Sequence, residues 1–201
     1  DYEWADLIDD VDKIRMLIDP TSSYAKAAAA AMGRSMDDVI ITAFNASADT
    51  GVTGGTSVAL PSTSKFATSN QSDGLTLAKL REAKKFFDSN DVDPSLKRYI
   101  VCGAQQISDL LGDSTVTSAD FNTVRALVQG EIDTFLGFQF VTSTRLPFDA
   151  TNTDDRLCFA YTEDAIKLAI GKDVQAKISE RADKSYSTQV YYCMSIGATR
   201  M

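Results

Sequence analysis

The stretch PTSSYAKAAAAAMGRSMDDVIITAFN, Pro20–Asn45, decides the fold of this 201-residue chain. Its small and apolar side chains recur at steps of three and four residues, which predicts one long amphipathic helix. The predicted stripe contains Tyr24, Ala27, Ala28, Ala31, Met32, Ser35, Val39, Ile40 and Phe44. At about 1.5 Å per residue, a helix of about 24 residues is about 36 Å long. A compact chain of this size has a radius of gyration of about 16 Å, so the helix would cross most of it.

A second long element is predicted near the end of the chain, in residues 186–199 (YSTQVYYCMSIGAT). Val190, Tyr192, Met194 and Ile196 alternate with other residues and would therefore share one face of a β-strand. At about 3.3 Å per residue, this strand would span about 45 Å. Two elements of such length predict a flat, elongated body, which is the shape of a building block.

The rest of the chain mixes helices and strands, which predicts the α+β class. A loop is expected over residues 46–74, with a short strand near 56–60. Helices are expected from a cap at Thr76 to Asn90, over 105–111, from a cap at Ser118 to Val128, and over 163–170 before Gly171. Strands are expected over 99–102, 137–142 and 156–161, and again from Val174.

Composition limits the classes of partner. The net charge is −8 and the sequence pI is about 4.5, so the chain is a poor candidate for gripping duplex DNA through its phosphates. The hydrophobic content of 44% is ordinary for a folded soluble protein. No apolar stretch of about 18 residues is present, and we expect no membrane span. The chain begins at Asp1 and stops at Met201, from which we expect a fragment or a processed product.

Residue types also argue against an enzyme and against a cofactor or metal site. The chain has no histidine, which removes the commonest general base and every histidine-containing zinc site. Cys102, Cys158 and Cys193 lack metal-site spacing and are expected to be free thiols. The glycine-rich residues 51–57 lack the lysine of a phosphate loop. Alternating oxygens over residues 149–155 lack the glycine of a calcium loop.

Acidic residues gather at the start of the chain, in DYEWADLIDDVDKIRMLID (residues 1–19). Asp9, Asp10 and Asp12 are candidates for a carboxylate pair in acid–base chemistry. With Asp6 and Lys13 nearby, they fit better a charged face that contacts a basic partner surface. The periodicity of this segment leaves open whether it is helical or an extended limb.

The order of these segments resembles the major capsid proteins of tailed bacteriophages, with the Hong Kong 97 type of fold. The resemblance rests on the lead WADLIDDVDKIRMLIDP, the helix ending GRSMDDVIITAF, a glycine–threonine loop and a T-x-x-K-L-x-x-A-K helix. The motif LGFQFVTSTRLP and the closing ISERADKSYSTQVYYCMSIGATR complete the pattern. It covers nearly the whole chain, and the order of segments is more specific than any one motif.

The resemblance implies three functional parts. Residues 1–19 would be the returning limb of an extended loop that overlies a neighbouring subunit. Residues 20–103 and 176–201 would form a peripheral domain with long strands and a spine helix over 21–45. Residues 104–175 would form an axial domain around the centre of a hexamer or pentamer.

The resemblance also implies a function: self-assembly into an icosahedral shell that encloses a double-stranded DNA phage genome, with the virion capsid as location and the host cytoplasm as place of assembly. Partners would be other copies of the chain, with scaffolding, portal or cement proteins as further candidates and weak, non-specific DNA contact at most. Two alternatives stay open, namely an encapsulin-like cellular compartment and a small-molecule-binding α+β domain. The predicted assembly residues are Trp4, Ile8, Asp9, Asp10, Asp12, Lys13, Arg15, Gly51, Gly54 and Gly55, with Trp4 as the main anchor.

Overall fold

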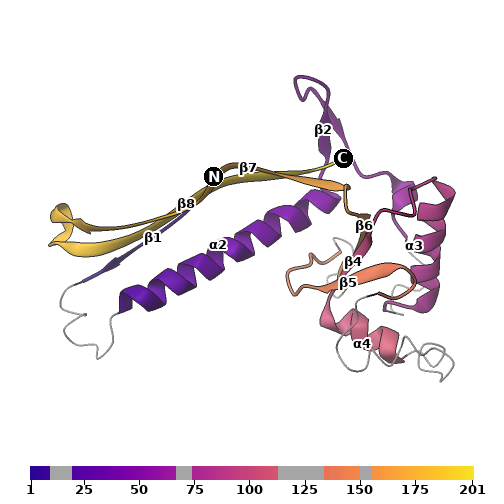
Figure 1. Ribbon diagram of the computed structural model, residues 1–201, viewed down its shortest axis with the longest axis horizontal. Helices are drawn as coiled ribbons and strands as arrows, with labels where there is room; N and C mark the ends of the chain where they lie inside the picture. The colour runs from indigo at the N-terminus through magenta and orange to yellow at the C-terminus, as the bar shows by residue number, and fades with distance from the viewer. Residues whose placement is uncertain (10–19, 67–73, 113–133, 150–154) are drawn as a thin grey trace. The chain divides into compact units, whose positions relative to one another are not determined.

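The computed structural model describes residues 1–9, 20–66, 74–112, 134–149 and 155–201 (Figure 1). These residues divide into two units. Unit 1 contains Asp1–Ala43 and Lys167–Arg200, and unit 2 contains Phe44–Ile166 together with Met201. The predicted helix from Ser118 to Val128 lies outside the described residues.

Unit 1 is a three-stranded sheet with one helix against it (Figure 1). The helix α2 (Pro20–Asn45) is continuous, which confirms the prediction of one long helix. The sheet has the order β1-β8-β7, from β1 (Tyr2–Ile8), β8 (Ser187–Arg200) and β7 (Ile166–Arg181). β1 runs antiparallel to β8, with Tyr2 opposite Met194 and Ile8 opposite Thr188.

The core of unit 1 lies between α2 and β8. It contains Ile8, Ala28, Met32, Val190, Tyr192 and Met194, and the half-buried Tyr24, Val174 and Ile196 pack against it. The predicted alternation in β8 is therefore confirmed. Burial of a side chain such as Val190 or Met194 contributes about 1.5–3 kcal/mol to the free energy of folding. On α2 the buried stripe is narrower than predicted, because Ala27 is exposed.

Unit 2 is built on a small mixed sheet of order β5-β4-β6. The central strand β4 (Arg98–Cys102) is parallel to β5 (Phe138–Thr142) and antiparallel to β6 (Phe159–Thr162). Two helices, α3 (Leu77–Ser89) and α4 (Ala104–Gly112), supply core side chains. The core of unit 2 contains Leu75, Leu80, Ala83, Ile100, Cys102, Leu110, Phe135 and Phe138.

Local chemistry explains the ends of α3. Thr76 accepts a hydrogen bond from the Lys79 amide at 3.5 Å, and the Asn90 amide donates back to the carbonyl of Phe86. The predicted cap and end of this helix are both confirmed. Unit 2 also contains a two-stranded hairpin of β2 (Ala48–Thr50) and β3 (Thr56–Val58), followed by a short 3₁₀ helix (Ser62–Ser64).

Two predictions about secondary structure need correction. The predicted helix over residues 163–170 is wrong, because Ile166 begins the sixteen-residue strand β7. A helix there would have only about two turns, and pairing with β8 satisfies the backbone of the whole segment instead. The predicted strand over 156–161 starts later, at Phe159, and Arg156 forms only an isolated bridge with Phe148.

Candidate assembly surfaces

The two apolar side chains predicted as contacts in the first segment pack on their own subunit. Trp4 is half-buried and lies edge-on to Tyr192, with 6.3 Å between ring centroids and an interplanar angle of 67°. Ile8 is 4% exposed and belongs to the core of unit 1. A serine at Ile8 would therefore lower the stability of the subunit and could not report on an interface.

Acidic side chains of the same segment are held at the surface. Asp9 is exposed and accepts a hydrogen bond from the Ser187 hydroxyl, while the exposed Glu3 lies close enough to Tyr191 to help raise the pKa of its phenol. Leu7 is 45% exposed and follows Glu3 on alternate positions of β1, so the two share a face. The remaining predicted residues of the segment, Asp10, Asp12, Lys13 and Arg15, lie outside the described residues.

The three glycines predicted as assembly contacts, Gly51, Gly54 and Gly55, lie in the turn of the hairpin between β2 and β3. Gly51 and Gly54 have φ values of +89° and +66°, a backbone region that favours glycine. The Gly54 amide donates to the Gly51 carbonyl at 3.2 Å, and Gly55 leads into β3. Every residue from 49 to 59 is exposed. A turn that joins two antiparallel strands is not the strand–loop–helix context of a phosphate loop.

An exposed apolar row lies on β7, at an edge of the sheet in unit 1. Leu168, Ile170 and Ile178 are 38%, 52% and 56% exposed and occupy alternate positions with Val174, which packs on the core. Long edge strands with exposed apolar side chains are association sites. The predicted contacts do not include this row, although the alternation of Ile166, Leu168 and Ile170 in the sequence indicates it.

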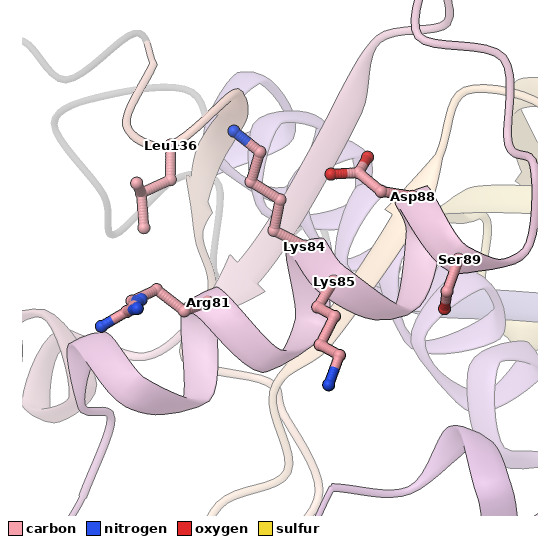
Figure 2. A pocket seen from close by; sticks show the side chains of 6 residues that line it. All are labelled: Arg81, Lys84, Lys85, Asp88, Ser89 and Leu136. Atoms are coloured by element: carbon pink, nitrogen blue, oxygen red, sulfur yellow. The ribbon is translucent and has the colours of Figure 1, made fainter.

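A shallow groove lies on the exposed side of α3 in unit 2. It is lined by Arg81, Lys84, Lys85, Asp88, Ser89 and Leu136, and Figure 2 shows all but Leu136 projecting from the same helix. The side-chain amine of Lys79, one turn earlier, donates to the Gly74 carbonyl at 2.5 Å. The groove gathers positive charge in a chain of net charge −8. The spacing of Arg81, Lys84 and Lys85 in KLREAKK was the signal that could have found it.

The cysteines have no catalytic or metal-binding arrangement in the described part of the chain. All three are free, which confirms the prediction of thiols without disulfides. Burial raises the pKa of Cys102 to about 12 and that of Cys158 to about 11, so both thiols stay protonated and unreactive. Among the described residues, no group of three acidic, cysteine or histidine side chains is placed to hold a metal ion. The described helices include none with the length and apolar character needed to cross a membrane.

The whole chain, residues 1–201, matches the family described as phage capsid protein. The chain belongs to this family. It is a structural capsid protein, as the order of its sequence segments predicts, and the alternatives of a cellular compartment and a ligand-binding domain are not favoured. Curated proteins give no significant match.

Solved phage capsids share the fold of this family member. The capsid structure of cyanophage P-SCSP1u matches with a TM-score of 0.74 at 18% identity, over 100% of this chain and 68% of that chain. The cyanophage Pam1 capsid asymmetric unit matches with a TM-score of 0.71 at 16% identity, over 100% and 70%. A structure of Mycobacterium phage Che8 matches with a TM-score of 0.64 at 23% identity, over 98% and 65%. The chain thus spans about two thirds of these structures, and at these identities the likeness concerns the fold.

Proposed function

We propose that this capsid protein is the major coat subunit of a tailed phage, without enzymatic activity. Its copies would assemble as hexamers and pentamers into an icosahedral shell around a double-stranded DNA genome. Family membership and the fold shared with solved phage capsids support this function. The observation that carries the self-assembly is the apolar row Leu168, Ile170 and Ile178 on an edge strand, because a monomer gains nothing from exposing it.

Weak contacts are enough for such a shell. Burying apolar surface contributes about 25 cal/mol per Å², so a row of three side chains gives a modest contact. Each subunit of a closed lattice touches several neighbours, and the contacts then act together. The exposed hairpin turn at Gly51, Gly54 and Gly55 and the exposed acid Asp9 are the other contact surfaces we assign.

The three functional parts belong to the same proposal. Residues 1–19 serve as a limb that reaches a neighbour, residues 20–103 and 176–201 as the peripheral domain, and residues 104–175 as the axial domain. Assembly takes place in the host cytoplasm, with scaffolding, portal or cement proteins as partners. Contact with the packaged DNA is weak and non-specific, because the chain carries a net charge of −8.

The test uses the full-length coat protein, expressed with any scaffolding protein and examined by electron microscopy and sedimentation. The wild type should form closed shells. A double variant, Ile170→Asp with Ile178→Asp, should keep the wild-type circular dichroism and melting temperature, because both side chains are more than half exposed. It should form few shells or none.

Lys177→Asp is the matched control, because it adds the same charge on the other face of β7. It should assemble normally. A wild-type protein that stays monomeric in the presence of its scaffold would overturn the coat function. Normal shells from the double variant would remove β7 from the contacts but leave the coat function standing.

A further inference from the structure

The groove on α3 carries unpaired positive charge. Arg81, Lys84 and Lys85 are exposed and lie at steps of three and four residues, so they share one side of the helix. Among the described residues, none of the three makes an ion pair or a side-chain hydrogen bond. The single carboxylate of the groove, Asp88, is already neutralised, because it accepts a hydrogen bond from Arg98 Nη1 at 2.7 Å.

The groove also has an apolar wall. Leu136 stands at the turn before β5 with φ +54°, an uncommon backbone region for a bulky residue. Two backbone hydrogen bonds between Phe135 and Phe138, of 2.9 and 3.0 Å, hold this turn, and both phenylalanines are buried. Figure 2 shows the half-buried Leu136 side chain beside those of Arg81 and Lys84. The fold thus holds an apolar side chain next to a row of cations.

This combination selects a class of ligand. DNA phosphates would pair with the cations of the groove but would make no favourable contact with Leu136. The net charge of −8 also opposes DNA binding by the chain as a whole. A peptide segment with alternating acidic and apolar side chains would satisfy both parts of the groove. The groove therefore fits an acidic protein segment better than a nucleic acid.

The strand β1 is a segment of this kind, with acidic and apolar side chains exposed on one face. Residues 1–12 contain six acidic residues and no lysine or arginine. The Ser187 hydroxyl holds Asp9 at the surface, Glu3 is exposed on the same strand, and Leu7 is exposed between the two acids. Leu7 and Asp9 are about 7 Å apart along an extended chain, and Arg81 and Lys85 are about 6 Å apart along the helix. Leu136, Lys84 and Lys85 line the same groove, so a leucine and a carboxylate on one side of a strand can engage it together.

We propose that the α3 groove of one subunit binds the Leu7–Asp9 end of β1 from a second copy of the chain. Leu7 packs on Leu136, and the Asp9 carboxylate accepts hydrogen bonds from the amines of Lys84 and Lys85. This inference rests on the proposed coat function and assigns a receiving surface to its first segment. Similar complementary charges at protein interfaces set register and exclude wrong partners.

Carbodiimide crosslinking of assembled, full-length wild-type protein tests the contact directly, because the reagent joins a carboxylate to an amine only where the two touch. Shells assembled from a mixture of ¹⁵N-labelled and unlabelled copies should yield a peptide pair that links Asp9 to Lys84 or Lys85. In an equal mixture, mass spectrometry should find pairs that carry the label on one peptide only, which a crosslink within a single copy cannot give. Assembled shells without this crosslink, or a crosslink found only within single copies, would overturn the proposal.

Charge reversal provides a second test. Lys84→Glu with Lys85→Glu, and separately Glu3→Lys with Asp9→Lys, should each weaken association by about tenfold or more in sedimentation. Mixing the two variants should restore association, because each then meets an opposite charge on the other. Lys26→Glu, on the exposed side of α2, is the control and should associate normally.

The outcomes separate this contact from the function on which it rests. A wild-type protein that never associates removes the coat function. Wild-type shells together with fully assembling Lys84→Glu/Lys85→Glu protein remove only the groove contact. If that variant assembles normally but loses affinity for double-stranded DNA fragments, the groove is a nucleic-acid surface and the proposal is wrong.

Discussion

The hydroxyl of Tyr192 on β8 donates a 3.2 Å hydrogen bond to the backbone carbonyl of Ala25 on α2. The two residues are 167 positions apart in the chain, and their contact joins the helix to the sheet inside unit 1. The Tyr192 ring is buried and also packs against the Trp4 ring in a T-shaped arrangement. One side chain thus links three elements of the unit: β1, α2 and β8.

Replacing Tyr192 with phenylalanine should lower the free energy of unfolding by about 1 kcal/mol, because it removes this hydrogen bond and keeps the ring. Urea denaturation followed by circular dichroism measures the change. Tyr186→Phe is the matched control, because Tyr186 is 64% exposed, and it should leave stability unchanged. Equal effects of the two substitutions would show that the bond to Ala25 does not stabilise unit 1.

Gly33→Ala should stabilise the protein by about 1 kcal/mol, because alanine is the better helix former at an exposed interior position of α2. A Cβ at Gly33 would meet no atom within 4 Å. Gly74→Ala should destabilise the protein, because Gly74 has φ +61° and the new Cβ would overlap the Asp109 carboxylate. Thermal unfolding should raise the melting temperature for the first variant and lower it for the second. A destabilised Gly33→Ala protein would contradict the open surroundings of that residue.

The buried thiol of Cys102 predicts a loss of stability at high pH. Its pKa is raised from 9.0 to about 12 by burial and by the nearby Cys158. The folded state therefore favours the protonated thiol, and its stabilising contribution is complete below about pH 9 and disappears as the pH rises towards 12. The free energy of unfolding should fall less steeply above pH 9 in Cys102→Ala than in the wild type. Parallel curves for the two proteins would show that this thiol does not titrate as its burial requires.

Local sequence patterns predict α2, α3 and β8 correctly, because the residues that define each element lie within the element itself or beside it. The helix α2 follows from its three- and four-residue periodicity, and α3 from the cap at Thr76 and the end at Asn90. The strand β8 follows from the alternation of Val190, Tyr192 and Met194. In each case the residues that share the buried face are close in sequence, so the period alone reports which face is buried.

The features that the sequence did not predict share a physical cause: each depends on a contact with residues that are distant in the chain. Residues 166–170 alternate as a strand does but are also spaced as a short helix, and β8 decides between the two. The burial of Ile8 in the core also depends on β8, where Thr188 lies opposite it. The α3 groove likewise needs Leu136, 47 positions after Ser89.

The pairing of β1 with β8 sets the order in which the two units can fold during synthesis. Tyr2 is opposite Met194, and ribosomes add about 5–20 residues per second, so β1 waits roughly 10–40 s for its partner to be synthesised. Unit 2, apart from Met201, is continuous in sequence and can fold during that interval. Unit 1 therefore closes only after β8 has been made, when unit 2 has already left the ribosome as one continuous segment.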